Sequence, residues 1–564
     1  MTVIHYSVTD VTVCDIWLRG LAPNAELYVR KNGAVVEAVT AECTEEALCA
    51  HVRVDESGDY SFEWDGDQVS VELAYAYRPE HVLDEGITQL VVSSENERPQ
   101  YVPLYHFTPP WGWINDPNGM CVFGDRIHMF YQHMPLLRRR KRTMIYWGHA
   151  TSRDGLNWTH LPIFLGPREE LLRDPTKGGG AYSGSVIPMP DQNGLRVFYT
   201  DREDDRLPER EWQQVAVSRD LISAGPSETI IRERPNVPNL GNDFRDPYVF
   251  KGPDGLWKMT LGARNDIGGV VLLYETTDPT AAGGWTFVQP IYQIIDHGLG
   301  AAECPCILPL NEDGLWVLVL GLITRSEAPR HRDISLAIVG KFDGREFQPL
   351  HTQEFDYGTD AYAFQGWLDA DGPLGIAWAA NWAEISREVD YFSGYTLARR
   401  LEWRGDHLAT PPAYSTESLR TRLLADCVSP ATIALNDGAA ELVVEMSQSV
   451  GPVRIEIDVP GEHIAFEVGN AEMHLEYGMG GDPSTYMAKG RPSTLRVFVD
   501  IGIVEIYADD GRWCFTKRIA TWLPARTVRI DAVGASMKVW SIKKTTAANE
   551  PSATNGQVLE NCDV

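Results

Sequence analysis

The stretch WINDPNG, residues 113–119, opens the first of five similar segments and places Asp116 directly before a proline. The later segments open on YSGS at 182–185, FRDP at 244–247, ECP at 303–305 and Asp360. Each opening is followed by an apolar run, a turn that contains glycine and a second apolar run. A repeat of about sixty residues made of short strands is typical of a propeller blade. The sequence therefore predicts a five-bladed β-propeller.

Five blades around one axis would bring their opening residues together. Asp116, Asp246 and Glu303 lie far apart in sequence, yet each would reach the same central pocket. Proline after each aspartate favours extended backbone, which suits a side chain held at a strand end. Two carboxyl groups facing one bond are what glycoside hydrolysis requires. The three acids are therefore the candidate catalytic residues.

The regions around the repeats are also rich in predicted strands. The repeats occupy residues 101–410, and alternating polar and apolar residues in 1–100 predict a small N-terminal β domain. Residues 420–545 alternate in the same way and predict a C-terminal β-sandwich. Residues 546–564 are polar and predict a disordered tail. The expected fold class is all-β.

Composition limits the partners and the compartment. The formal net charge of −29 disfavours binding to nucleic acid or to an anionic membrane. The N-terminus shows neither a basic start nor a long apolar run, so we expect a cytoplasmic protein, with secretion left open as an alternative. Nine cysteines in no compact framework indicate free thiols. Cys304 and Cys306 lack a partner pair at zinc spacing, so we expect no metal and no cofactor.

These motifs resemble those of glycoside hydrolase family 32, the invertase, inulinase and levanase family. WINDPNG resembles the nucleophile motif with Asp116, RDP the transition-state-stabilising motif with Asp246, and ECP the acid/base motif with Glu303. The resemblance implies a propeller followed by a sandwich, retention of configuration and no metal. It also implies substrate-binding roles for further residues, which are Asn115, Gln132, Trp147, Ser183, Arg245 and Trp378.

The expected activity is release of terminal β-D-fructofuranosyl units from sucrose or short fructo-oligosaccharides through a covalent intermediate. Asp246, oriented by Arg245, would hold fructose hydroxyls as the transition state forms. A fructosyltransferase and a levanase or inulinase remain alternatives on the same scaffold, and a non-catalytic fructan-binding propeller is a distant one. The motifs do not separate these activities.

Two charged segments depart from the family pattern. Residues Arg138–Arg142 form a run of five cations, which is either a solvated loop, a contact with an acidic neighbouring subunit or an anion site for a substrate such as sucrose 6-phosphate. DREDDR at 201–206 is a second charged segment, which is either a surface loop, a rim that narrows the pocket or a rim that closes the pocket of a dimer partner. A homodimer is a further possibility, and residues 1–100 could serve fructan binding, dimerisation or the shielding of a sheet edge.

Overall fold

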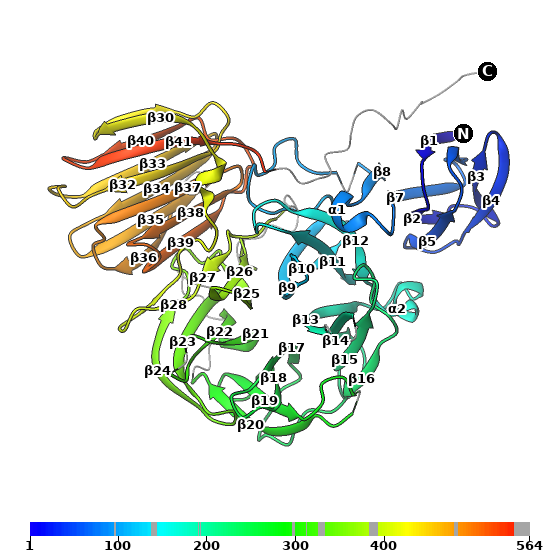
Figure 1. Ribbon diagram of the computed structural model, residues 1–564, viewed down its shortest axis with the longest axis horizontal. Helices are drawn as coiled ribbons and strands as arrows, with labels where there is room; N and C mark the ends of the chain where they lie inside the picture. The colour runs from blue at the N-terminus through cyan, green and yellow to red at the C-terminus, as the bar shows by residue number, and fades with distance from the viewer. Residues whose placement is uncertain are drawn as a thin grey trace.

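The computed structural model describes the chain apart from residues 95–96, 137–143, 190, 192, 282, 296–298, 312, 325–332, 383–392, 479–482 and 546–564. The basic run Arg138–Arg142 and the predicted disordered tail at 546–564 thus lie outside the described residues. Strands dominate, and helices α1 (Val82–Glu85) and α2 (Glu169–Arg173) are each about one turn long. The protein is all-β, with a central propeller between an N-terminal and a C-terminal β-sandwich (Figure 1).

The N-terminal sandwich consists of two four-stranded sheets. The first, in sheet order, contains β1 (Thr2–Val8), β6 (Gly58–Trp64), β3 (Ala25–Lys31) and β4 (Ala34–Ala41). The second contains β5 (Leu48–Val54), β2 (Thr12–Gly20), β7 (Val69–Tyr77) and β8 (Thr88–Val92). Asn32 and Gly33 join β3 to β4 with φ angles of 51° and 82°, as a tight hairpin turn of this type requires. An apolar core that includes Ile16, Leu27 and Phe62 lies between the sheets.

The propeller forms a ring of five blades, numbered here in chain order (Figure 1). Blade 1 contains β9 (Trp113–Phe123), β10 (Arg126–Met134), β11 (Met144–Ser152) and β12 (Thr159–Leu165). Blade 2 contains β13 (Gly179–Met189), β14 (Gly194–Glu203), β15 (Glu211–Ser218) and β16 (Glu228–Ile231). Blade 3 contains β17 (Phe244–Lys251), β18 (Trp257–Arg264), β19 (Gly269–Thr276) and β20 (Thr286–Gln293).

The last two blades follow the same plan. Blade 4 contains β21 (Leu299–Pro309), β22 (Leu315–Thr324), β23 (Asp333–Phe342) and β24 (Phe347–Glu354). Blade 5 contains β25 (Tyr362–Asp369), β26 (Gly372–Trp378) and β27 (Arg399–Arg400), and it is followed by the small ladder of β28 (Glu402–Trp403) and β29 (Leu408–Ala409). Inner strands of neighbouring blades contact one another, including β9 with β25, so the last blade packs against the first and closes the ring.

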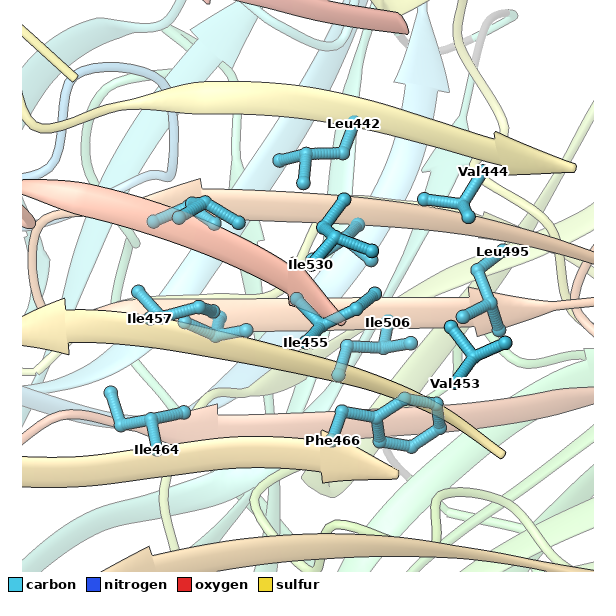
Figure 2. Packing of buried hydrophobic residues seen from close by; sticks show 14 of the residues in the cluster. Leu442, Val444, Val453, Ile455, Ile457, Ile464, Phe466, Leu495, Ile506 and Ile530 are labelled. Carbon is cyan, nitrogen blue, oxygen red and sulfur yellow. The ribbon is translucent and has the colours of Figure 1, made fainter. Parts of the chain in front are cut away.

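The C-terminal sandwich packs two six-stranded antiparallel sheets face to face. One sheet contains β30 (Arg420–Val428), β41 (Ser536–Ile542), β32 (Ala440–Glu445), β37 (Thr494–Asp500), β38 (Ile503–Ala508) and β39 (Trp513–Arg518). The other contains β31 (Ala431–Ala434), β40 (Thr527–Asp531), β33 (Val453–Val459), β34 (Glu462–Val468), β35 (Glu472–Gly478) and β36 (Ser484–Lys489). Figure 2 shows Leu442, Ile455 and Phe466 in the aliphatic core between the sheets. Alternate residues along each strand point into this core, as period-two patterning predicts.

A buried ionic cluster fastens the propeller to this sandwich. Arg399 of β27 donates to Asp356 at 2.9 Å and to Glu505 of β38 at 2.8 Å. His106, just before blade 1, lies 2.9 Å from both Asp500 and Glu505, and its side chain is fully buried. The two carboxylates on the sandwich therefore face cations that the propeller supplies.

Candidate active site

Every blade carries a β-bulge on its inner strand, and the bulges position the predicted site residues. The pairing register slips at the same place in each inner strand, where the inner strand has one residue more than its partner. The residues that fall inside the slips are Asn115 and Asp116, Ser183, Asp246 and Pro247, Cys304 and Pro305, and Ala363 and Phe364. Bulges redirect side chains that a regular strand would point into a sheet face. Asp246, Cys304 and Ala363 have φ angles of 65°, 48° and 52°, a strained region for non-glycine residues.

Asp116 is surrounded by hydrogen-bond donors. Its Oδ2 accepts from Ser183 Oγ at 2.6 Å and from Gln132 Nε2 at 3.3 Å, and its Oδ1 accepts from Asn115 Nδ2 at 2.9 Å. Gln132 also donates to Ser183 and accepts from Asn115, so the four side chains form one network. Burial raises the pKa of the Asp116 carboxyl, and the hydrogen bonds from Ser183 and Asn115 oppose that rise. The network brings together four of the residues predicted from sequence.

Asp246 lies next to Cys304 on the neighbouring blade. The backbone N–H of Cys304 donates to Asp246 Oδ2 at 2.9 Å, and the backbone N–H of Asp246 donates to Thr200 Oγ1 at 3.1 Å. Burial raises the pKa of Asp246 to about 7, with the charges of Glu303 and Asp116 adding to the rise and Arg245 opposing it. Asp246 is therefore a carboxyl whose ionisation is disfavoured by its surroundings, a feature common at functional sites.

Glu303 is held between a cation and a phenol. Arg245 Nη2 donates to its Oε1 at 2.7 Å, and Tyr362 OH donates to its Oε2 at 2.6 Å. On its other side Arg245 donates to Glu211 Oε1 at 3.0 Å and to Asp243 Oδ1 at 2.9 Å. The expectation that Arg245 orients Asp246 is thus corrected, because the guanidinium pairs with Glu303 and the Cys304 backbone holds Asp246.

Cys304 links two of the acids across the axis. Its Sγ lies 3.4 Å from Asp116 Oδ2 and 3.7 Å from Asp246 Oδ2, although Asp116 is 188 residues away in sequence. When the blades are aligned on their bulges, Cys304 occupies the position of Asp246, the first residue of the bulge. Glu303 precedes its bulge by one residue, as Tyr362 does in blade 5. The sequence repeat alone did not reveal this offset.

The fifth predicted anchor, Asp360, faces away from the other acids. Its Oδ2 accepts the backbone N–H of Arg518 at 2.8 Å and lies 3.1 Å from Lys517 Nζ, both on sandwich strand β39. The expectation that all five anchors meet at the axis is therefore wrong for Asp360. Tyr362, two residues later, is the residue of blade 5 that reaches the acid cluster.

The two tryptophans with predicted substrate-binding roles do not reach the protein surface. Trp147 and Trp378 are fully buried, with 0% exposure. Trp147 Nε1 donates to the carbonyl of Tyr182 at 3.0 Å, and Trp378 Nε1 donates to Ser393 Oγ at 3.1 Å. Neither ring has a free face on which a sugar could stack, so the predicted substrate-binding role of these tryptophans is corrected to packing behind the site.

Trp382 is the exposed member of the aromatic group around Trp378. Its side chain is 36% exposed, and its ring lies 4.8 Å from that of Trp378 and 5.5 Å from that of Trp113. An exposed indole backed by two buried ones is suited to stacking on a sugar face. The motif NW at 381–382 contained this residue, but sequence could not tell which tryptophan keeps a free face.

Comparison with known families identifies the chain. Residues 106–412 match the family described as "Glycosyl hydrolases family 32 N-terminal domain", and residues 428–547 match "Glycosyl hydrolases family 32 C terminal". The chain belongs to glycosyl hydrolases family 32. The N-terminal sandwich lies outside both matched regions of this family 32 protein.

Curated relatives of this family 32 protein act on sucrose-type sugars and fructan according to their names. A sucrose-6-phosphate hydrolase of Escherichia coli is 30% identical over 454 residues, covering 74% of this chain and 89% of the relative. A raffinose invertase of Escherichia coli is 29% identical over 484 residues, and the match covers 78% of this chain and 95% of the relative. A levanase of Bacillus subtilis (strain 168) is 28% identical over 78% of this chain and 70% of its own.

Solved structures share the fold. A family 32 glycoside hydrolase from Bifidobacterium adolescentis superposes with a TM-score of 0.85 at 19% identity, covering 97% of this chain and 100% of that chain. A Bombyx mori β-fructofuranosidase mutant in complex with sucrose gives a TM-score of 0.68 at 23% identity, covering 80% of this chain and 96% of its own. The first likeness spans almost the whole chain, so an N-terminal domain before the propeller is not peculiar to this protein.

Proposed function

We propose that this family 32 glycoside hydrolase releases fructose from the non-reducing ends of sucrose and short fructo-oligosaccharides, with retention of configuration. The observation that carries the proposal is the convergence of Asp116, Asp246 and Glu303 at the bulges of blades 1, 3 and 4, joined by Cys304 and Arg245. Glycoside hydrolysis with retention needs a nucleophile and an acid/base on the two sides of the scissile bond. The names of the relatives agree in naming sucrose-type or fructan substrates.

In this proposal Asp116 is the nucleophile. The hydrogen bonds from Ser183 and Asn115 stabilise its carboxylate inside a buried pocket and fix its orientation. An oriented carboxylate avoids the entropic cost of finding its attack geometry. Asp116 would form an ester to the anomeric carbon as the glycosidic bond breaks, and water would later cleave that ester.

Glu303 is the proposed acid/base residue. It would give a proton to the departing glycosidic oxygen and then take one from the attacking water. Tyr362 and Arg245 hold one oxygen each, which restricts the rotation of the carboxyl group. Tyr362 and Arg245 are therefore positioning residues for the proton transfer.

Asp246 is the proposed transition-state stabiliser. As a carboxylate it would accept hydrogen bonds from fructose hydroxyls, and these bonds strengthen as positive charge develops on the ring. The peptide N–H of Cys304 fixes one of its oxygens at 2.9 Å. The strained φ of both residues is the kind of distortion that a functional geometry maintains.

Unphosphorylated sugars are the proposed substrates because the cations of the described rim are already paired. Arg202 donates to Asp204 at 2.8 Å and to Glu211 at 3.0 Å, and it lies over the ring of Tyr182 at 5.0 Å. Arg206 donates to Asp201 at 2.8 Å. Such pairing leaves these guanidinium groups poorly placed to bind a substrate phosphate. Sucrose 6-phosphate stays the second candidate, since a relative is named for its hydrolysis and the basic run Arg138–Arg142 lies in sequence between β10 and β11 of blade 1.

Sugar release from a panel of substrates tests the proposal. Sucrose, sucrose 6-phosphate, kestose, inulin and levan would be compared by kcat/KM, with glucose and fructose measured separately. We expect equal glucose and fructose from sucrose and no preference for the phosphate. Glucose in excess of fructose, together with new oligosaccharides, would indicate a fructosyltransferase. No release from any of these substrates would contradict hydrolysis and favour a fructan-binding propeller.

The assembly and location of the protein stay predictions. We propose a cytoplasmic protein that can form a homodimer, on the basis of the sequence arguments above. No helix within the described ranges is long and apolar enough to cross a membrane. Light scattering coupled to size exclusion would measure the oligomeric state, and cell fractionation would measure the location.

A further inference from the structure

The N-terminal sandwich turns one sheet face toward the propeller, and a small set of polar side chains lies on that face. Asp15 of β2 is paired in register with His51 of β5 on one side and with Tyr75 of β7 on the other. Cys49 lies two residues from His51 along β5, so both point to the same face as Asp15. Residues on the opposite face, such as Cys14 and Ile16, pack into the sandwich core.

These three side chains bring three different donor atoms together. A carboxylate oxygen of Asp15, the Sγ of Cys49 and a ring nitrogen of His51 all lie within 4.8 Å of one another. Asp15 Oδ1 and His51 Nδ1 are 2.7 Å apart. Within the described part of the chain, this is the one group of three or more such residues with that geometry.

The three residues are held in fixed positions, and an ion can reach them from solvent. The Asp15 side chain is 5% exposed, whereas the His51 side chain is 71% exposed, so the cluster opens to solvent on its histidine side. Strand pairing fixes the backbone of all three residues, which keeps the donors in place before any ion arrives.

We propose that Asp15, Cys49 and His51 form a binding site for one divalent metal ion of the zinc type. A thiolate, an imidazole and a carboxylate are zinc ligands, and a water molecule would fill the fourth tetrahedral position. Magnesium and calcium prefer oxygen ligands, and a site with one sulfur and one nitrogen ligand disfavours both. On binding, the Cys49 thiol proton passes to solvent, and neutral His51 donates a ring-nitrogen lone pair.

The site lies at the seam between the N-terminal sandwich and the propeller. Tyr75, next to Asp15 in the sheet, accepts a hydrogen bond from the backbone N–H of Ile163 in β12 at 3.0 Å. The Tyr75 ring stacks on Trp111, with centroids 5.3 Å apart and planes at 21°. Trp111 precedes the first strand of blade 1 by two residues. An ion that fixes β2 against β5 therefore stabilises the sheet face on which the propeller docks.

Metal binding to the full-length protein tests this proposal without depending on activity. Protein dialysed against a chelator would be titrated with Zn²⁺ by calorimetry and with Co²⁺ by absorption spectroscopy. We expect one Zn²⁺ per chain, a thiolate-to-cobalt charge-transfer band and a rise in Tm when zinc is added. Cys49→Ser should abolish the charge-transfer band, and His51→Ala should weaken zinc binding by about tenfold or more.

Two variants in the same sandwich serve as matched controls. Cys43 is an exposed free cysteine, and His5 is an exposed histidine on β1, so Cys43→Ser and His5→Ala should leave the band, the stoichiometry and the zinc-induced rise in Tm unchanged. Far-UV circular dichroism would verify that Cys49→Ser is folded. The absence of a thiolate band in the wild-type protein would overturn the proposal. A band that survives Cys49→Ser and disappears in Cys43→Ser would overturn it as well, by placing the ion at the exposed thiol.

Discussion

The propeller axis and the propeller–sandwich interface both bury carboxylates, but the groups around those carboxylates differ. At the interface, Glu505 accepts from Arg399 and lies against His106, and Asp500 accepts the backbone N–H groups of Leu104 and Tyr105. At the axis, the charges of Glu303 and Asp116 add to the rise in the pKa of Asp246, and Arg245 pairs directly with Glu303.

The pKa values record this difference. Burial would raise the pKa of Glu505, but the charge of Arg399 and the hydrogen bond from His106 lower it to about 2. Burial instead raises the pKa of Asp246 to about 7; the charge of Arg245 opposes this rise, and the charges of Glu303 and Asp116 add to it. Buried ion pairs of the first kind hold two domains in register, whereas buried acids of the second kind are unfavourable and persist where chemistry requires them. The lowered pKa of Glu505 is therefore typical of a structural contact between domains, whereas the raised pKa of Asp246 is typical of a reactive centre.

The largest expected effect is on turnover when an axial acid is removed. Asp116→Ala and Glu303→Ala should each lower kcat on sucrose by at least about 10³-fold, since each removes a group that takes part in bond breaking. The free energy of unfolding of Asp116→Ala should stay the same or rise, because a buried like charge is removed, whereas Glu303→Ala also removes an ion-pair partner of Arg245 and should lower it. Steady-state kinetics and urea unfolding would measure the two quantities. Near-normal turnover by either variant would contradict the assignment.

The interface should show the opposite behaviour. Arg399→Leu leaves Glu505 and Asp356 buried without their cation and should cost about 3–5 kcal/mol of unfolding free energy, while kcat per folded molecule stays near the wild-type value. Arg404→Leu is the matched control, because Arg404 pairs with Glu402 and Asp510 at the surface and should cost under about 1 kcal/mol. Equal losses in the two variants would show that the cluster does not hold the domains together.

A smaller effect is expected from the phenol that positions Glu303. Tyr362→Phe removes one hydrogen bond to a charged group, worth about 1.5–3 kcal/mol, and should lower kcat by about 10- to 100-fold with little change in KM. Tyr395→Phe is the matched control, because the buried Tyr395 hydroxyl has no hydrogen-bond partner in the described structure. A loss of kcat in Tyr395→Phe as large as in Tyr362→Phe would show that the Glu303 contact is not responsible.

The smallest expected effects come from a change of pH, which should alter activity at the axis and stability at the interface over different pH ranges. Asp246 must ionise to accept hydroxyl hydrogen bonds, so kcat/KM should rise with pH through about 7.

At the interface, burial lowers the pKa of His106, but Asp500 and Glu505 outweigh this effect and raise the pKa to about 9. This folded pKa is above the ordinary value of 6.5, so the stabilisation from His106 is complete below pH 6.5 and is lost as pH rises through 9. Tm should therefore fall between these limits, and the fall should be smaller in His106→Gln.

Most of the architecture could be predicted from sequence because its signals are local or periodic. Turn glycines, alternating strands and the motifs around Asp116, Asp246 and Glu303 indicated the propeller, the C-terminal sandwich and three acids in one pocket. The N-terminal strands alternate in the same readable way. Each of these signals lies within about ten residues of sequence.

The missed features depend on register and on burial. Relative to the bulge that begins at Asp246 in blade 3, the predicted anchor lies one residue early in blade 4 and three residues early in blade 5, so Cys304 and Tyr362 were not recognised and Asp360 was placed at the axis. Sequence could not distinguish the buried Trp378, at the end of β26, from the exposed Trp382, four residues later, because both are tryptophans in one short segment. Likewise, Asp15 meets Cys49 and His51 through the pairing of β2 with β5, which sequence spacing does not encode.

The most direct test of the central claim is to identify the residue that carries the covalent fructosyl group. Glu303→Ala would be mixed with a fructoside that has a good leaving group, which needs no acid to depart, and the quenched protein would be digested and analysed by mass spectrometry. The account predicts one fructosyl unit on the peptide that contains Asp116, because the intermediate forms there but lacks the base that activates water. A fructosyl unit on the peptide that contains Asp246, or rapid fructose release without any adduct, would contradict it.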